Sequence, residues 1–433
     1  MEERKYIPFT EEMRKDYTIL VPNMLPRHFK IFLKIFEDYG YKMELLETSG
    51  HRIIETGLKY VHNDTCYPAI LVIGQFIDAL NSGKYDPHKT ALILFQTGGG
   101  CRASNYIFLL RKALERAGYG YIPVISLNLA GLENHPGFKL TLPMLHRLFY
   151  GIIYGDMLLS LVNQCKPYEK NKGQTEQLAD ELTALLANKM QTEGISFKKV
   201  KQNCKMILSR FAEIPRVNEE KVKVGVVGEI YVKYSPLGNN NLEQFLIDEG
   251  AEVVVPGLLD FFMYCIVSNI SDIELYGLHK IRKPVLNFVF NYLQKQQNEI
   301  IELMKTDGNF TPPTLIAHTM DLIKDFMGFG TKMGEGWLLP AEMLELNDEG
   351  VHNIVCTQPF GCLPNHICGK GMMKPLKEKK PDMNIVAIDY DSGASKVNQE
   401  NRIKLMLANA RADLAEKNRE NNIKTEEKAY AEA

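Results

Sequence analysis

The stretch Ala91-Leu-Ile-Leu-Phe-Gln-Thr-Gly-Gly-Gly-Cys-Arg-Ala-Ser-Asn-Tyr106 decides the fold of this chain. Its first five residues form an unbroken apolar run, which is typical of a strand buried in a parallel sheet. Three glycines then lead to Cys101, and apolar residues recur at helical spacing from Tyr106 to Leu114. The stretch therefore predicts a strand that passes through a glycine loop into a helix.

The same alternation of strand and helix recurs on both sides of this stretch. We expect further strands at 17–21, 42–46, 121–127, 222–227, 251–255, 353–356 and 384–388. This rhythm predicts an α/β fold with two Rossmann-like parallel-sheet domains and a helical segment between them. The expected boundaries are 1–139 for the first α/β domain, 140–220 for the helical segment, 221–415 for the second α/β domain, and 416–433 for a polar tail that we expect to be frayed.

Composition excludes several classes of protein. The 433 residues carry a formal net charge of −2, and no basic excess points to nucleic acid. No run approaches the ~18 apolar residues of a membrane helix, and Met1–Lys5 do not begin a signal peptide. We therefore expect a cytoplasmic protein. In that reducing compartment its eight cysteines would be buried thiols, reactive thiols or metal ligands rather than disulfides.

Three cysteines stand where a strand or loop feeds a helix. Cys66 follows a cluster of capping residues and comes just before Pro68, which suits a first helical turn. Cys101 follows the glycine loop, and Cys362 follows the expected strand at 353–356. A helix N-terminus lowers the pKa of a thiol and stabilises bound negative charge. Because ligands bind at the carboxyl ends of parallel strands, the three thiols can converge in one cleft.

Other interpretations of the cysteines and the glycine loop stay open. Cys165 and Cys204 lie within helical patterns and are expected in the core. Cys265, Cys356 and Cys368 can be core residues or further ligands. A phosphate loop at 98–100 is disfavoured because no Lys-Ser/Thr pair follows it. A zinc or thiol-redox protein is disfavoured because the chain has no C-x-x-C.

Three motifs carry a resemblance to a known family. They are Cys66-Tyr-Pro-Ala69, Gly99-Gly-Cys-Arg-Ala-Ser-Asn-Tyr106 and Gln358-Pro-Phe-Gly-Cys-Leu-Pro-Asn-His-Ile367. With them the chain resembles the 2-hydroxyacyl-CoA dehydratase component family, and in particular its activator-associated branch of double-cubane cluster proteins. The resemblance extends from about Tyr17 to Leu407.

The resemblance implies a 4Fe–4S cluster held by Cys66, Cys101 and Cys362, with one iron left open. The double-cubane relatives hold a larger cluster with more cysteines. Because the chain has eight cysteines, we expect this larger cluster, with Cys356 as the first further ligand, followed by Cys265 and Cys368. Electrons would come from a separate ATP-hydrolysing activator that has its own 4Fe–4S cluster, in an anaerobic cell. Separately from the resemblance, the even distribution of hydrophobic helices along the chain leads us to expect a homodimer.

Polar residues beside an expected strand end are candidates for catalysis. Glu229 directly follows the strand at 222–227, and Tyr231 and Lys233 come next, although an exposed loop explains them equally well. The leading hypothesis is an enzyme that reduces or dehydrates a small substrate at an open iron. The alternative is a non-catalytic cluster carrier or electron-relay protein.

Overall fold

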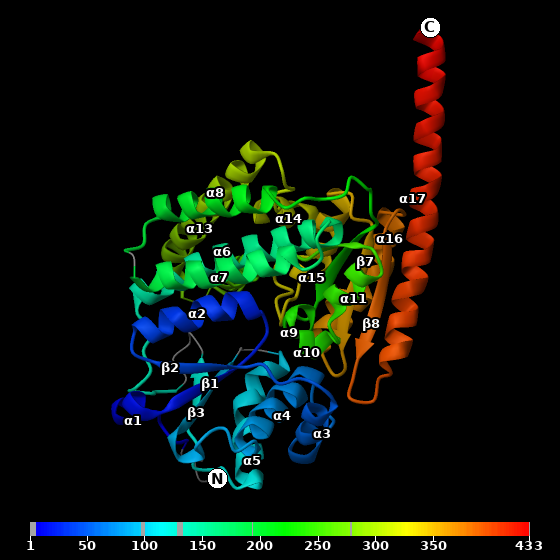
Figure 1. Cartoon of the computed structure of the whole chain (residues 1–433). Coiled ribbons are helices and arrows are strands. Elements are labelled where there is room, and N and C mark those ends of the chain that lie inside the picture. Colours follow the sequence, from blue (N-terminus) through cyan, green and yellow to red (C-terminus); the bar gives the residue numbers. More distant parts are fainter. Residues whose placement is uncertain (1–5, 97–99, 128–132, 193, 278, 433) are drawn as a thin grey trace.

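The computed structural model describes residues 6–96, 100–127, 133–192, 194–277 and 279–432. Within these ranges the chain is a mixed α/β fold with two four-stranded sheets, and all paired strands in both sheets are parallel (Figure 1). The predicted pair of Rossmann-like parallel-sheet units is confirmed.

The first unit has the strand order β2-β1-β3-β4. Its strands are β1 (Thr18–Pro22), β2 (Lys42–Leu46), β3 (Thr90–Phe95) and β4 (Val124–Leu127). Its helices are α1 (Glu11–Asp16), α2 (Pro26–Asp38), α3 (His51–Tyr60), α4 (Tyr67–Asn81) and α5 (Tyr106–Ala117). Strand β4 is shorter than the expected 121–127 and begins only after Pro123.

Helix α4 is apolar on all sides and is buried from Tyr67 to Leu80, as expected for a helix enclosed by other elements. It crosses α3 very closely. A Cβ atom at Gly74 would lie 2.2 Å from the Ile53 carbonyl oxygen, and one at Gly57 would lie 2.2 Å from the Ile70 carbonyl oxygen. Only glycine allows this approach of the two backbones. The crossing fixes the direction in which α4 presents its N-terminus.

The second unit has the strand order β6-β5-β7-β8. Its strands are β5 (Lys223–Gly228), β6 (Glu252–Val254), β7 (Asn353–Pro359) and β8 (Asn384–Tyr390). Its helices are α9 (Ile230–Tyr234), α10 (Pro236–Asn239), α11 (Leu242–Asp248), α15 (Leu338–Asp348), α16 (Met373–Lys379) and α17 (Lys396–Glu432). Strand β7 runs three residues beyond the expected 353–356, because 357–359 continue the pairing with β8.

Two stretches of the chain build the helical layer. The segment between the units forms α6 (Leu142–Cys165), α7 (Gln174–Thr192) and α8 (Phe197–Ala212). The connection between β6 and β7 adds α12 (Leu258–Tyr276), α13 (Lys283–Asp307) and α14 (Ile316–Ile323). Helix α12 packs on α6, and α13 packs on α8. One apolar core joins these helices to α2 and to one face of the first sheet.

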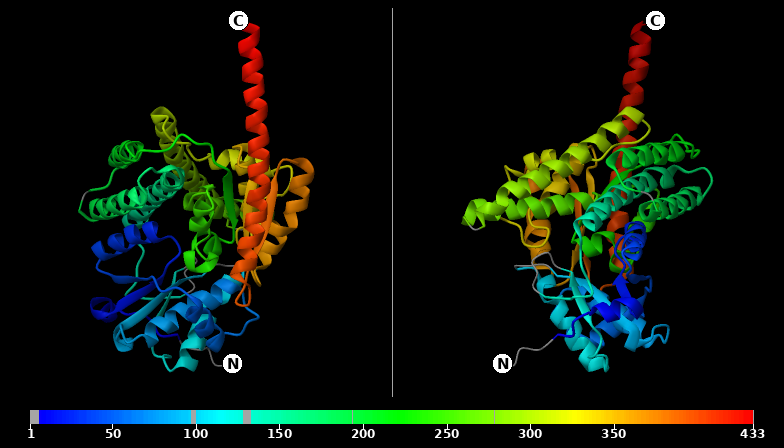
Figure 2. Two further views of the ribbon diagram at one scale, coloured as in Figure 1. Left: turned by 45° about the vertical axis from the view of Figure 1, so that its right-hand side comes forward. Right: turned by 90° about the vertical axis from the view of Figure 1, so that its left-hand side faces the viewer.

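Most of the expected polar tail lies in the last part of one long helix. Helix α17 runs without a break from Lys396 to Glu432, and its second half extends away from the body of the molecule (Figures 1 and 2). Its start packs on β8 through Ile403, Met406 and Leu407. Beyond 410 the sequence is rich in Ala, Glu, Lys and Arg and contains no Gly or Pro, which favours continuation of the helix.

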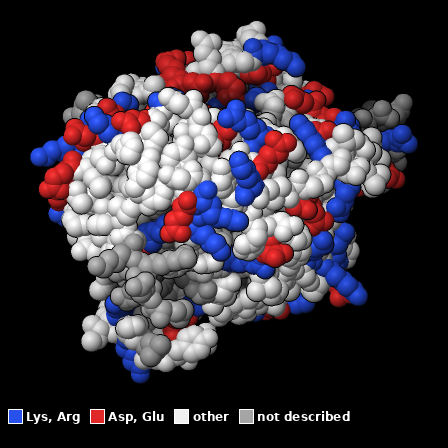
Figure 3. Space-filling view, turned by 90° about the horizontal axis from the view of Figure 1, so that it is seen from below, with Lys and Arg blue, Asp and Glu red and all other residues white. Residues whose placement is uncertain are grey.

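In the described part of the chain, none of the helices has the length and apolar character that crossing a bilayer requires. Residues 1–5, on which the expectation of no signal peptide was based, lie outside the described residues. On the face shown in Figure 3, basic and acidic side chains are interspersed, and a broad area carries no charge. This face offers no extended basic surface of the kind that binds nucleic acid.

Candidate cysteine site

Each of the three key cysteines directly precedes a helical segment. Cys66 is the N-cap residue of α4, and Cys101 is the N-cap residue of the short 3-10 turn Arg102–Asn105 that leads into α5. Cys362 follows β7, and its carbonyl oxygen accepts a hydrogen bond of 3.1 Å from the backbone N–H of His366 in the next helical turn. All three sulfur atoms are therefore attached where unpaired backbone N–H groups and helix dipoles favour negative charge.

Cys66, Cys101 and Cys362 line one cavity of about 220 Å³, to which both α/β units contribute. The loops that carry Cys66 and Cys362 touch directly, since the backbone N–H of Tyr67 donates a hydrogen bond of 3.0 Å to the carbonyl oxygen of Phe360. Gly361 has a φ of +71°, and a Cβ atom there would lie 2.9 Å from the Thr65 carbonyl oxygen. The contact between the loops therefore requires glycine at this position.

Burial is the largest influence on the pKa values of Cys66 and Cys362. Cys66 is 4% exposed, and burial raises its pKa to about 12, although the Tyr106 hydroxyl lies only 2.6 Å from its sulfur. Burial also raises the pKa of Cys362, and the nearby charge of Glu335 adds to the effect. These thiols are neutral near pH 7 with nothing bound, and a cationic ligand such as a metal would have to stabilise their thiolate forms.

Two buried carboxyl groups share the cavity with the thiols. Glu229 is the N-cap residue of α9, and its Oε2 accepts a hydrogen bond of 2.9 Å from the N–H of Val232. Glu335 Oε1 accepts a hydrogen bond of 3.0 Å from the N–H of Ile230, so both carboxyls sit at one helix N-terminus. Burial and the charge of Glu335 raise the pKa of Glu229 to about 8, and burial raises that of Glu335. The pair therefore holds at least one proton at neutral pH.

The other two candidates near Glu229 have different positions. Tyr231 lines the cavity, is 8% exposed, and among the described residues its hydroxyl has no hydrogen-bond partner. Lys233 does not line the cavity. Its Nζ lies 2.9 Å from Glu342 Oε1 in an ion pair whose side chains are 4% and 2% exposed. Lys233 is thus a partner of a buried carboxylate, whereas Tyr231 offers a hydroxyl to a ligand.

The structure does not bring the further cysteine candidates into this cavity. Cys356 lies within β7, and its sulfur is 3.7 Å from Asn365 Oδ1. Cys265 lies on α12 and Cys368 in the π-helical turn Asn365–Gly369, and neither is among the described residues that line the cavity. The physical reason for the position of Cys356 is the length of β7, which places this residue three positions before the end of the strand rather than at it.

Two further thiols and one residue of the glycine loop lie outside the contacts described so far. Cys165 and Cys204 are fully buried in the core, as expected. Of the glycine loop, Gly98 and Gly99 lie outside the described residues, and Gly100 donates its N–H to the sulfur of Met333 at 2.9 Å. In the second unit, Glu335 caps α9, which precedes it in the chain by about a hundred residues.

The thiols are not arranged for a single metal ion. Among the described residues, no group of three or more His, Cys, Asp or Glu side chains is placed to hold one ion. A cluster has different requirements, because each iron takes its own thiolate and the sulfur atoms need only surround the cluster. Three thiols around a cavity, each at a helix N-terminus, fit an anionic cluster better than a zinc ion. In comparisons with known proteins, no family model and no curated protein matches this chain.

Proposed function

We propose that this chain is an iron–sulfur protein whose cluster is held by Cys66, Cys101 and Cys362. One observation carries the proposal. Three cysteines that are far apart in the sequence line a single cavity, and each precedes a helical segment whose N-terminus favours negative charge. We further propose that the chain is a relative of the 2-hydroxyacyl-CoA dehydratase components and acts in the cytoplasm, accepting electrons from an ATP-hydrolysing activator.

A bound 4Fe–4S cluster would supply low-potential electrons and one iron that is open to a substrate oxygen. The residues of the chain would provide the rest of the site. The cavity wall includes Phe29, Phe32 and Phe262, which exclude water and strengthen electrostatic interactions inside. Three protein thiolates leave the fourth iron without a cysteine, so the donor set suits binding of a small substrate.

Glu229 and Glu335 supply the proton that reduction or dehydration of a small substrate requires. Their carboxyl groups line the cavity, and the raised pKa of Glu229 keeps it protonated near pH 7. The hydroxyl of Tyr231 is available to hydrogen-bond the substrate. This combination of proton donor and hydrogen-bond donor beside the thiols favours an enzyme over a carrier or relay protein, which needs neither.

Iron and sulfide analysis of anaerobically purified protein tests the cluster. We expect about four irons per chain for a single cubane and about eight for a double cubane. Changing Cys66, Cys101 or Cys362 to Ala should remove most of the iron in each case. Cys204→Ala is the matched control, because this thiol is buried in the core, and it should keep the iron content of the wild type. Full iron retention in the Cys101→Ala variant would refute the assignment.

The proton-donor role has a separate test. Glu229→Gln and Glu335→Gln should keep their iron but lose about tenfold or more of the turnover driven by activator and ATP. Glu378→Gln, an exposed change of the same kind, should leave turnover unchanged. A variant that lost iron and turnover together would instead indicate that the carboxyl groups only support the thiol loops.

Reduction of the wild type by a mild donor, at the same rate without activator and ATP, would contradict the proposed partner.

A further inference from the structure

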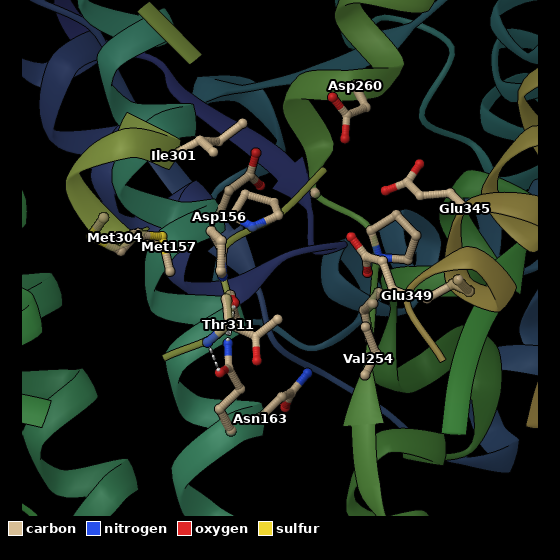
Figure 4. Close-up of a pocket in the computed structure, with 18 of the residues that line it drawn as sticks. Asp156, Met157, Asn163, Val254, Asp260, Ile301, Met304, Thr311, Glu345 and Glu349 are labelled. Atoms are coloured by element: carbon tan, nitrogen blue, oxygen red, sulfur yellow. Dashed lines mark hydrogen bonds between the residues drawn. The ribbon is translucent and has the colours of Figure 1, made fainter. Parts of the chain in front are cut away.

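A second cavity of about 130 Å³ lies apart from the cysteines, between the helical layer and the edge of the second sheet at β6. Figure 4 shows the carboxyl groups of Asp156, Asp260, Glu345 and Glu349 around it, from α6, α12 and α15 and the turn after α15. At ~30 Å³ per water molecule, this volume corresponds to about four waters or one small organic molecule. None of the residues proposed for the iron–sulfur site lines it.

Two of the four acids already have the partners that explain their positions. Asp156 accepts hydrogen bonds of 2.8 and 2.9 Å from the backbone N–H groups of Leu258 and Leu259, and it also contacts His28 at 2.8 Å. It therefore fixes the start of α12. Glu349 accepts a hydrogen bond from the Thr314 hydroxyl. Neither carboxyl needs a ligand to account for it.

Asp260 and Glu345 are different. They are each 7% exposed, and Figure 4 shows their carboxyl groups turned toward one another across the cavity. Asp260 accepts a hydrogen bond of 2.8 Å from Gln297 Nε2, and Glu345 accepts one of 2.6 Å from the Thr319 hydroxyl. Within the described ranges no Lys, Arg or His forms an ion pair with either carboxyl. Burial raises the pKa of Asp260 to about 7, and burial together with the charge of Asp260 raises that of Glu345.

Gln297 gives an independent indication that a ligand is missing. It lines the same cavity and is 6% exposed, and its Oε1 is buried without any hydrogen-bond partner among the described residues. A buried amide oxygen without a partner costs about 1–3 kcal/mol. Two carboxyl groups and one amide oxygen therefore border one space, and within the described residues the amide oxygen has no donor.

The chemistry of the ligand follows from these acceptors and from the opposite wall. A primary ammonium group has three N–H donors and a positive charge, which matches two carboxylates and an amide oxygen. A metal ion is disfavoured because no three acidic, His or Cys side chains in the described residues are placed to hold one. Six apolar side chains make up a large part of the remaining wall and suit a short carbon chain, namely Ile153, Met157, Val254, Ile300, Ile301 and Met304.

We propose that this cavity binds a small primary alkylammonium ion, with the nitrogen held by Asp260, Glu345 and Gln297 and the carbon chain against the apolar wall. The site is separate from the iron–sulfur site, so the cluster can be absent or present without changing the proposal. Bound there, the ion bridges α12, α13 and α15, and it stabilises the packing of the helical layer on the second unit.

Isothermal titration calorimetry of the full chain with n-butylammonium chloride tests the proposal, at about pH 8, where Asp260 is mainly ionised. We expect saturable binding that 1-butanol, of the same shape but without charge, does not show. Asp260→Asn should weaken binding about tenfold or more. Asp321→Asn removes an exposed carboxylate outside the cavity and should leave binding unchanged.

Two further variants keep the test decisive if Asp260→Asn does not fold. Glu345→Gln removes the second carboxylate and should weaken binding to a similar degree, and Gln297→Leu should weaken it less because both carboxylates remain. Equal binding of 1-butanol, unchanged affinity in these variants, or no binding of n-butylammonium at millimolar concentrations would each overturn the proposal. Stabilisation of the chain by Mg²⁺ or Ca²⁺ but not by the amine would overturn it in favour of a metal site.

Discussion

The two α/β units have the same strand order but supply different chemistry to the cavity between them. In each unit the chain runs from the third strand into a cysteine, from β3 to Cys101 and from β7 to Cys362. The connections between the second and third strands differ. In the first unit this connection contains α4 and adds Cys66, whereas in the second unit it contains α12 to α15 and adds Glu335.

The proposed site needs thiols and proton-holding carboxyl groups, and the two units supply these groups unequally. Equivalent positions give one thiol from each unit, and the compact connection of the first unit adds the third. The long connection of the second unit brings in buried acids. Among the described residues, all carboxyl groups whose pKa is raised by burial lie between Glu229 and Glu349. The first unit thus mainly supplies thiols, and the second supplies both a thiol and the proton-holding groups.

The largest effect on stability is expected from the buried ion pair of the second unit. Lys233→Met should lower the free energy of unfolding by about 3–5 kcal/mol, because it leaves Glu342 buried without its cation. The matched change in the first unit is Lys34→Met, which removes the 42% exposed partner of the 51% exposed Glu37 and should cost about 1 kcal/mol or less. Urea denaturation of both variants measures the difference. Equal losses would show that burial does not distinguish the two pairs.

Much of this comparison could be predicted from the sequence, because local patterns determine it. The apolar run that became β3 predicted this strand, and the proline after Cys66 predicted the start of α4. Tyr106 and Glu335 were not predicted as site residues, since contacts across the cavity decide their roles. The strand order, the length of β7 and the shared helical layer depend on pairing between distant segments, which periodicity does not encode.

A pH dependence of stability should reside in the second unit. Burial raises the pKa of Asp260 from 3.8 to about 7, so between these values the folded chain holds a proton that the unfolded chain has lost. Stability should therefore fall as pH rises from about 4 to about 7 and then level off, by at most about 4 kcal/mol for this group. Asp260→Asn should flatten the curve relative to Asp321→Asn in urea denaturation across this range. A curve of unchanged slope would contradict the assignment to Asp260.

The contact between the two cysteine loops can be tested with a smaller change. Gly361→Ala should cost about 2 kcal/mol, because a Cβ atom there would meet the backbone at Thr65 and Cys66 and φ is +71°. Gly118→Ala has a similar φ of +83° but open space around the added atom, so it should cost about 1 kcal/mol. Only the Gly361→Ala variant should also lose iron, since it moves Cys362 relative to Cys66. Iron retention in both variants would show that the loops adapt independently.

The smallest effect on stability is expected for a change at Cys356. The iron content of the same variant tests whether the second unit supplies one cysteine ligand or two. The family resemblance makes Cys356 the first further ligand of a double cubane, but the thiol is buried within β7, with its sulfur 3.7 Å from Asn365 Oδ1. With this geometry, Cys356→Ala should cost only about 1 kcal/mol of stability and should keep all the iron of the wild type. Cys362→Ala, six residues further on, should lose most of it. Loss of about half the iron in the Cys356→Ala variant would instead mean that the end of β7 opens when the cluster is loaded. In that case the second unit would supply a thiol from a strand as well as from a helix N-terminus, and the cluster would be the larger one.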